Sequence, residues 1–442
     1  MNMTRIELQK KLEEYFDAHF DEILSDLDEL ISIESAAAAP LEYRPYGQGS
    51  ADALAWAFKF MEEKVKMHTV NYGNYVVKGE CDINTPPVLA VLAHLDTVPA
   101  GEGWSYPPYR LTADGENLYG RGTIDDKGPA IAAMWAAKAI RDLEIPVKNF
   151  ALIFGGGEEV GDEKDIEEYA KNNGGFPPMV FTPDGSFPVL NCEKGMIHLT
   201  FSSPFADGFI KSINGGTVIN AIPDKCSVIY SEKDAPTAVM YSGKSAHGSR
   251  PENGDNAIAK FLTEYAEDNG DNPMLCSLAK LFPHGEFDGS SCGMGFSDEV
   301  SGRMTCALTM LNTNGGRLCG GVDIRFPIDR TYGEIRGIIT EKLAEAGFEI
   351  DECSGMEPHY VSADTPLVKT LLEVYEDIKG EKGECIAEGG VTYVHNIPGG
   401  VAFGAEFPWE NNNMHGADEH ISVETFKYNL NMYANAIVRL CE

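Results

Sequence analysis

Short apolar runs alternate with helical stretches through the first half of the chain. The runs at 88–93, 150–154 and 179–182 have the length of buried strands. The stretch 129–141 is rich in alanine and opens with proline, which is typical of the first turn of a helix, and 165–172 also has a helical pattern. Because strands and helices alternate, the pattern predicts an α/β fold, a mostly parallel sheet flanked by helices.

Both ends of the chain predict amphipathic helices. In 1–35, leucines and phenylalanines such as Leu8, Leu12 and Phe16 recur at helical spacing. This stretch is rich in acids and lacks the uninterrupted apolar core of a signal peptide, so a cytoplasmic location is the expectation. At the other end a strand pattern at 400–403 precedes an amphipathic stretch from about Val423 to Arg439.

The middle of the chain has a different character. It mixes strand-like alternation and glycine-rich turns with helical patterns at 255–267 and 332–346, which predicts an α+β domain. The last segment returns to buried-strand character. We therefore expect one discontinuous domain, 1–192 plus 388–442, and an inserted domain at 193–387.

Length and composition restrict the class of protein. A chain of 442 residues exceeds the roughly 250–300 residues at which single cores stop growing, so more than one domain is expected. Its 43% hydrophobic and 24% charged residues are ordinary for a globular protein and exclude wholesale disorder. No apolar run approaches the roughly 20 residues that a membrane-spanning helix needs.

Charge and cysteine usage exclude several functions. The net charge of −34 repels phosphate backbones and anionic lipid, so no nucleic acid and no membrane is expected as a partner. The simplest interpretation of this acidity is solubility, and cation binding by a minority of the carboxylates stays open. The 10 cysteines are irregularly spaced without a CxxC, so we expect reduced thiols rather than a zinc finger or a redox motif.

Five polar motifs are candidates for chemistry, and three of them directly follow predicted strands. They contain His94 and Asp96, Asp125 and Asp126, Glu158 and Glu159, Asp184, and His415. Taken singly, each motif is more typical of a structural turn, a helix cap or an acidic loop than of a functional site. Ligands gather at the carboxyl ends of strands in open α/β sheets, so the motifs taken together favour a shared functional site. Mixed histidine and carboxylate donors suit zinc, or less strongly manganese or cobalt.

The motifs as a set resemble the co-catalytic zinc peptidase family, which includes carboxypeptidase G, aminoacylases, carnosinases and PepV-type dipeptidases. The matching segments are HLDTVPAGEGW (94–104), YGRGTIDDKGP (119–129), GGEEVG (156–161), TPDGSFP (182–188) and GKSAHGSRPENGDNAI (243–258). Together with the long middle domain and GVAFGAEFP (400–408), the form GTIDDKGP is most similar to PepV-type dipeptidases. The resemblance implies a zinc-exopeptidase-like catalytic domain with an inserted lid domain for substrate recognition.

The resemblance also implies two divalent metal ions per chain, most often zinc. His94, Asp125 and Asp184 would hold one ion, and Asp125, Glu159 and His415 the other, with Asp125 bridging. The peptide bond after Asp125 is expected to be cis. Two zinc ions, three carboxylates and one hydroxide sum to zero charge, so such a cluster could be partly buried. Without metal the carboxylates would repel one another, and we expect a less stable protein.

Further roles follow from the same resemblance. Asp96 would orient the first histidine, and Glu158 would be the general base. His247 would face the developing oxyanion, Asn220 would help to hold the substrate, and Arg325 would clamp the terminal carboxylate of the substrate. From the residues alone, Asn220 is equally typical of a turn, and Arg325 of a surface strand.

One segment departs from the PepV-type pattern. The stretch 389–395, Gly-Gly-Val-Thr-Tyr-Val-His, contains one extra residue and ends in His395, where the family usually carries a basic residue, often arginine. The substrate contact expected from this loop therefore stays open, whereas the metal ligands are unaffected.

The sequence thus predicts a metal-dependent dipeptidase that hydrolyses dipeptides or short peptides. The alternative is an N-acyl amino acid deacylase with the same metal centre, because both reactions break an amide next to a free carboxylate. A degenerate relative that only binds partners is a third hypothesis, against which the retention of all five ligands and Glu158 argues. A monomer is favoured, a homodimer stays open, and the lid is expected to close over the substrate.

Overall fold

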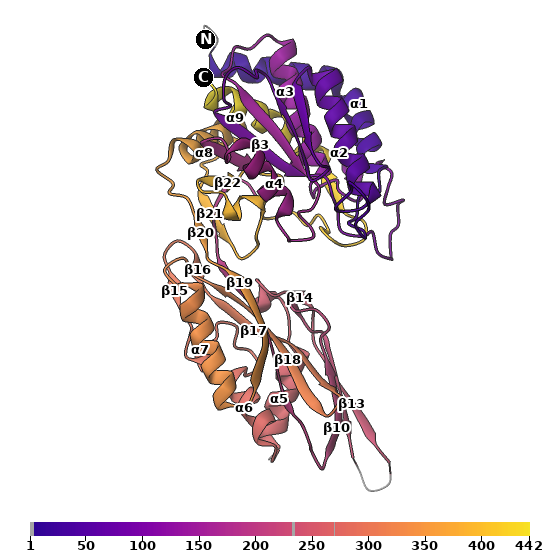
Figure 1. The fold of residues 1–442 in the computed structure, drawn as a ribbon, viewed down its shortest axis with the longest axis vertical. Helices are drawn as coiled ribbons and strands as arrows, with labels where there is room; N and C mark the ends of the chain where they lie inside the picture. The colour runs from indigo at the N-terminus through magenta and orange to yellow at the C-terminus, as the bar shows by residue number, and fades with distance from the viewer. Residues whose placement is uncertain (1–3, 232–234, 269) are drawn as a thin grey trace. The chain divides into compact units, whose positions relative to one another are not determined.

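Alternating strands and helices build the first of two units in the computed structural model, which describes residues 4–231, 235–268 and 270–442 (Figure 1). Unit 1 consists of Met1–Asn191, Val361–Ile386 and Thr392–Glu442, and unit 2 of Cys192–Tyr360 and Ala387–Val391. The sequence placed all of 193–387 in the inserted domain. Val361–Ile386 instead belongs to unit 1, because its helix α8 (Pro366–Lys379) packs on α9 (Val423–Leu440).

A nine-stranded mixed sheet has the order β1-β2-β6-β3-β7-β22-β8-β20, and β21 also pairs with β8. Its strands are β1 (His68–Tyr72), β2 (Val76–Glu80), β3 (Leu89–His94), β6 (Phe150–Gly155), β7 (Met179–Thr182), β8 (Val189–Glu193), β20 (His359–Tyr360), β21 (Cys385–Glu388) and β22 (Gly400–Ala402). β6, β3, β7 and β22 run parallel to one another. The prediction of a mostly parallel sheet is correct for these four central strands. It is wrong for the flanks of the sheet, where three pairs are antiparallel: β1 with β2, β2 with β6, and β22 with β8. A short turn joins β1 and β2, as antiparallel neighbours allow.

Helices cover both faces of the parallel strands. Leu89, Val91 and Ala93 of β3 belong to a core shared with α1 (Arg5–Ile31), α2 (Gln48–Phe60), α3 (Lys127–Asp142) and α9. Ala90 and Leu92 point to the opposite core, formed with α4 (Lys164–Asn173) and the 3₁₀ helix η4 (Tyr393–Asn396). Successive side chains of a strand point to opposite faces, so a strand buried on both sides is apolar throughout. This is why 88–93 shows no alternation.

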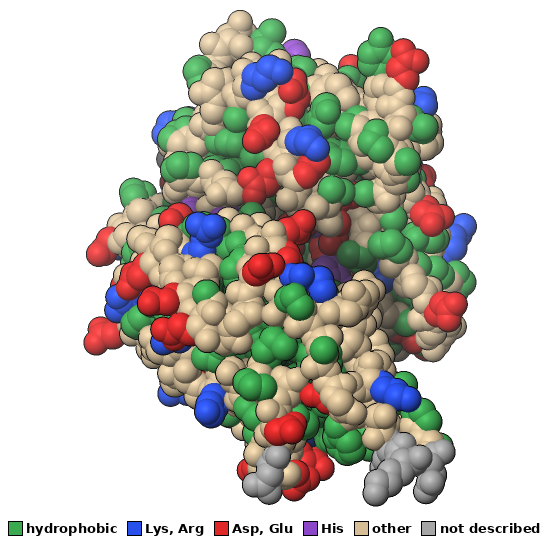
Figure 2. Space-filling model, turned by 60° about the horizontal axis from the view of Figure 1, so that its bottom comes forward, with side chains coloured by type: hydrophobic (Ala, Val, Ile, Leu, Met, Phe, Trp, Pro, Cys, Tyr) green, Lys and Arg blue, Asp and Glu red, His purple; other side chains and the backbone are tan. Residues whose placement is uncertain are grey.

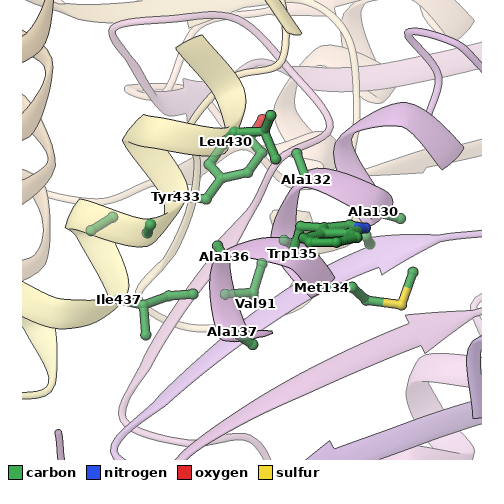
Figure 3. Packing of buried hydrophobic residues seen from close by; sticks show 14 of the residues in the cluster. Val91, Ala130, Ala132, Met134, Trp135, Ala136, Ala137, Leu430, Tyr433 and Ile437 are labelled. Atoms are coloured by element: carbon green, nitrogen blue, oxygen red, sulfur yellow. The ribbon is translucent and has the colours of Figure 1, made fainter. Parts of the chain in front are cut away.

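Helix α3 packs against α9 and begins directly after the candidate residues Asp125 and Asp126. Figure 3 shows its small side chains, including Ala132 and Ala136, near Leu430, Tyr433 and Ile437 of α9. Alanine at these positions lets two helices approach closely without loss of helix propensity. The helix begins at Lys127, two residues before the predicted start, so Asp125 lies directly ahead of its first turn.

A smaller three-stranded sheet joins two distant loops of unit 1. It consists of β4 (Thr112–Asp114), β5 (Asn117–Tyr119) and β23 (His420–Ser422), in the order β23-β5-β4. Tyr119 pairs with His420 in this sheet. The loop that follows Tyr119 and the loop that precedes His420 therefore start from neighbouring positions. A π-helical turn, η1 (Met61–Val65), completes the elements of the described part of unit 1.

Unit 2 contains an antiparallel sheet with the order β13-β12-β10-β17-β18-β9-β19, in agreement with an α+β domain. Its strands are β9 (Gly195–Pro204), β10 (Ile210–Gly215), β12 (Lys225–Tyr230), β13 (Thr237–Ser242), β17 (Thr305–Asn314), β18 (Arg317–Phe326) and β19 (Glu349–Met356). Short pairs are formed by β11 (Ala221–Ile222) with β14 (Ala246–His247), and by β15 (Ser297–Asp298) with β16 (Gly302–Arg303). The helices are α5 (Ala257–Glu267), α6 (Pro273–Leu281), α7 (Tyr332–Glu345), η2 (Pro251–Asn253) and η3 (Ser290–Cys292). The unit has its own apolar core.

On the face drawn in Figure 2, Asp and Glu side chains are interspersed with Lys and Arg side chains. Among the described residues, no helix combines the length and the apolar character that crossing a bilayer requires. The expected cytoplasmic location stays a prediction.

Candidate metal centre

Five side chains from separate segments of unit 1 converge at one edge of the sheet. His94 ends β3, Glu159 lies in the loop after β6, and Asp184 follows β7. Because these three strands are parallel neighbours, their carboxyl ends meet at the same edge. Asp125 lies directly before α3, and His415 lies in the loop before β23. These are the five residues that the motifs indicated.

The five side chains form two groups that share Asp125. In the first group, His94 Nε2 lies 2.8 Å from Asp125 Oδ1 and 3.8 Å from Asp184 Oδ2. In the second, His415 Nε2 lies 2.7 Å from Asp125 Oδ2 and 3.4 Å from Glu159 Oε1. Within each group the potential ligand atoms lie within 4.8 Å of one another. Asp125 therefore presents one oxygen to each histidine, as a bridging carboxylate does.

The hydrogen bonds of His94 show that this donor set fits a cation. Its Nδ1 lies 3.0 Å from the backbone carbonyl of Asp96, which can only accept, so Nδ1 carries the proton of the neutral ring. The lone pair of Nε2 then faces the carboxylate of Asp125. The lone pairs of His94 Nε2 and Asp125 Oδ1 face each other across 2.8 Å, which is compatible only with a cation or a proton between the two atoms. A fully buried imidazole in this tautomer beside two carboxylates is a donor set that suits zinc.

Asp96 holds the turn that carries Glu158 and Glu159. Its two carboxylate oxygens accept the backbone N–H groups of Glu158 at 3.1 Å and of Glu159 at 3.0 Å. The side chain is also 3.5 Å from His94 Nδ1, although the backbone carbonyl of Asp96 is the nearer partner of that nitrogen. The sequence suggested only that Asp96 orients His94. The two hydrogen bonds from the backbone of Glu158 and Glu159 to Asp96 give it an additional role.

The carboxylates of the cluster repel one another, which shows in their pKa values. Burial, with Asp125 adding to the effect, raises the pKa of Asp184 to about 7. Burial also raises the pKa values of Glu158 and Glu159. For Asp125 burial acts in the same direction, but His415 and His94, in their protonated form, lower its pKa below the ordinary value. Converging acids of this kind are stabilised by a cation or by protons.

A second layer of buried residues supports the site. The peptide bond between Asp125 and Asp126 is cis, as the resemblance predicts, and the carboxylate of Asp126 accepts the backbone N–H of His94 at 3.1 Å. Asp165, from α4, accepts Gly157 N–H at 3.0 Å and the hydroxyl of Tyr393. Sequence reasoning missed Asp165, since it lies inside an acidic stretch that reads as a solvated helix.

Asn220, His247 and Arg325 belong to unit 2. Asn220 and His247 are close in space, because Ala221 pairs with His247 and the carbonyl of Asn220 accepts Gly248 N–H at 2.7 Å. Arg325 is only 3% exposed, so the alternative of a surface strand arginine is wrong. Its guanidinium forms a fork on Asp323 at 2.8 and 2.9 Å and donates to Gly389 O at 2.6 Å.

The tautomer of His247 is fixed by its own loop. The backbone N–H of Ser249 donates to Nδ1 at 3.2 Å, and the hydroxyl of Ser249 lies 2.7 Å from the same nitrogen. Because a backbone N–H can only donate, Nδ1 is an acceptor and the proton of the neutral ring is on Nε2. His247 is thus prepared to donate a hydrogen bond from Nε2. His395 lies buried in η4, and its relation to substrate stays open.

The chain is similar to known proteins over most of its length. The family model described as "Peptidase family M20/M25/M40" matches residues 90–439. The Beta-Ala-Xaa dipeptidase of Lactobacillus delbrueckii subsp. lactis is 30% identical over 97% of this chain and 97% of its own length. The crystal structure of human carnosine dipeptidase 1 superposes with a TM-score of 0.66 at 16% identity, covering 98% of this chain and 99% of that one. The structure of the di-peptidase Dug1p from Saccharomyces cerevisiae superposes with a TM-score of 0.62 at 12% identity, with 98% of each chain covered.

Proposed function

This chain belongs to peptidase family M20/M25/M40, and we propose that it is a two-metal dipeptidase whose substrates are dipeptides or short peptides. The observation that carries the proposal is the position of Asp125, whose two carboxylate oxygens face His94 and His415 separately. The names of relatives matched over nearly their whole length favour hydrolysis of peptide bonds over deacylation of N-acyl amino acids.

We propose that His94, Asp125 and Asp184 hold one divalent cation, and that Asp125, Glu159 and His415 hold the other. Zinc is the proposed metal, because histidine and carboxylate donors in this ratio suit it, with manganese or cobalt as alternatives. When bound, such a pair of cations polarises the substrate carbonyl and lowers the pKa of water.

Glu158 is the proposed general base. Its backbone is tied to Asp96, and its carboxylate is partly buried beside the cluster, where burial raises its pKa. A carboxylate with a raised pKa takes a proton from the attacking water and returns it to the leaving amine more readily than an ordinary one. Asp96 positions both this base and Glu159 through one carboxylate.

The proposed substrate contacts come from unit 2. His247 would donate from Nε2 to the oxygen on which negative charge develops, which stabilises the transition state more than the ground state. Arg325 is the proposed partner of the terminal carboxylate, a task that suits a guanidinium held by Asp323. Asn220 is proposed to hold the substrate beside His247.

A substrate panel tests the proposal. The purified chain is treated with a chelator, dialysed, and reconstituted with Zn²⁺ or Mn²⁺. Release of free amino acids is then measured with dipeptides, including β-alanyl ones, and with N-acetyl amino acids. We expect metal-dependent cleavage of dipeptides. Cleavage of the N-acetyl amino acids alone would establish the deacylase alternative instead.

A further inference from the structure

A buried carboxylate, Glu419, joins the two loops that carry Asp125 and His415. It is 0% exposed and lies four residues after His415. Its Oε1 accepts the backbone N–H groups of Gly122 at 2.9 Å and Ile124 at 3.1 Å, with that of Asp125 at 3.4 Å. One carboxylate oxygen therefore holds the turn that ends at the shared metal ligand.

Arg121 neutralises Glu419 and extends the connection to a third segment. The guanidinium pairs with Glu419 Oε2 and is 1% exposed. Its Nη2 donates to the carbonyl of Gly416, the residue after His415, at 3.0 Å. The same nitrogen lies 3.4 Å from the carbonyls of Pro99 and Ala100, in the segment that follows β3. Three ligand-bearing segments thus contact one ion pair.

Regular secondary structure does not reach these positions. The pairing of β5 with β23 ends at Tyr119 and His420, and one more backbone hydrogen bond, from Gly120 N–H to Glu419 O at 3.0 Å, continues it. Beyond that point the turn 121–125 and the loop 415–419 are joined by the Glu419 and Arg121 side chains. Removal of one partner of such a pair leaves backbone N–H groups and a charge unsatisfied in the interior.

We propose that Arg121 and Glu419 are positioning residues that set the distance between Asp125 and His415, and thereby the affinity for the cation held by Asp125, Glu159 and His415. This inference rests on the proposed metal centre. Neither residue belongs to the two groups of potential metal ligands. They act through the backbone of the ligands, as outer-shell partners of metal sites do.

Zinc binding to the whole chain, measured by competition with a chromogenic chelator, tests the proposal. The test variant is Glu419→Gln, which keeps the shape but removes the charge and one acceptor. The matched control is Asp26→Asn, a buried carboxylate (3% exposed) that accepts from Lys64 and Trp135 away from the ligand loops. Arg121→Lys is a second variant, which keeps the charge but loses the second nitrogen, Nη2, that donates to Gly416 O.

We expect two zinc equivalents for the parent chain and for Asp26→Asn. In Glu419→Gln one equivalent should bind about 10- to 100-fold more weakly, the usual effect of losing an outer-shell partner. The same equivalent should be lost in His415→Ala, and Arg121→Lys should change it in the same direction. These results would support the positioning role.

The possible failures can be told apart. A parent chain that binds no zinc would refute the proposed metal centre itself. If the parent chain binds two equivalents and both Glu419→Gln and Arg121→Lys titrate like it, the positioning role is wrong. It is also wrong if Asp26→Asn weakens the same equivalent to the same extent, since the effect would then come from general destabilisation.

Discussion

Asp125 is the residue on which the chemistry of unit 1 converges, because each of its oxygens faces a different histidine. Around it, Asp96 fixes the turn of Glu158 and Glu159 by two backbone hydrogen bonds. Glu158, the proposed base, is not among the side chains proposed to hold metal, although Asp96 holds its backbone together with that of Glu159. A substitution can therefore remove one function while it preserves the other.

Glu158→Gln should separate catalysis from metal binding. Loss of a general base typically costs about 10²- to 10⁴-fold in kcat, and the amide keeps the size of the side chain. Steady-state hydrolysis of a dipeptide and metal analysis of the same sample measure both properties. We expect the fall in kcat with two metal ions retained, and no change in Glu167→Gln, an exposed neighbour on α4. Full activity of Glu158→Gln would show that the base is misassigned.

Ser249→Ala should weaken the proposed oxyanion donor. The hydroxyl of Ser249 lies 2.7 Å from His247 Nδ1, and a hydrogen bond of this kind contributes about 0.5–1.5 kcal/mol, or roughly 2- to 10-fold in rate. We expect kcat to fall with KM unchanged, and ¹⁵N NMR to show a larger share of the ring protonated on Nδ1. Ser245→Ala, at an exposed serine of the same loop, is the control. An unchanged kcat and tautomer would contradict the role.

At the residue scale the sequence indicated the proposed ligands more clearly than the residues that support them. Three of the five motifs follow predicted strands, and it is the joint pattern of His94, Asp125, Glu159, Asp184 and His415, not any single motif, that suggests a site. Supporting residues act through the backbone of distant segments, as Glu419 does on a turn almost 300 positions earlier, a contact that no local pattern shows. A signal did exist, since Glu419 and Arg121 lie inside the motifs that contain His415 and Asp125.

Strands β9 and β18 contain an ion-pair network of His198, Asp323 and Arg325. This network should make the stability of unit 2 depend on pH. Burial opposes ionisation of Asp323, but hydrogen bonds from Arg325 and His198 lower its pKa to about 2, from the model-peptide value near 4. A carboxylate with a lowered folded-state pKa stabilises the fold above its unfolded-state pKa. That contribution, about 2 kcal/mol, is lost as the pH falls from about 4 towards 2.

Asp323→Asn tests this network. Chemical unfolding of the parent chain and of the variant is compared at pH 5, 4 and 3. Asparagine lacks the charge, so the variant should be less stable at pH 5 because Arg325 loses its partner. The difference in free energy of unfolding between the two proteins should shrink as the pH falls. A difference that stays constant from pH 5 to pH 3 would contradict a lowered pKa for Asp323.

Among the elements, three short apolar strands and two helices were predicted well. The strands β3, β6 and β7 and the helices α3 and α9 agree with prediction to within two residues at each end. Helix α2 was missed, since it begins at Gln48 and its N-cap residue, Gly47, provides no side-chain cap. Helix α8 was also missed, although Thr365 and Pro366 form a regular helix start. The antiparallel flanks of the sheet were missed because pairing between distant strands leaves no local pattern.

The whole molecule should depend on metal for part of its stability. All five proposed ligands belong to unit 1, and without a cation their carboxylates repel one another. A ligand that binds only the folded state adds about 2.7–4.1 kcal/mol at 100 to 1,000 times its Kd. We expect a chelator to lower the thermal midpoint, and added Zn²⁺ to restore it. Asp125→Ala should show no response to Zn²⁺, and a parent chain equally stable in chelator and zinc would contradict the proposal.

The most direct test of the central claim is anomalous diffraction at the zinc edge from crystals of the zinc-loaded chain. Two peaks are expected about 3.5–4 Å apart, the usual separation in two-metal sites. One peak should lie among His94, Asp125 and Asp184, and the other among Asp125, Glu159 and His415. Crystals from excess zinc without a peak at these side chains, or with zinc bound only elsewhere, would contradict it.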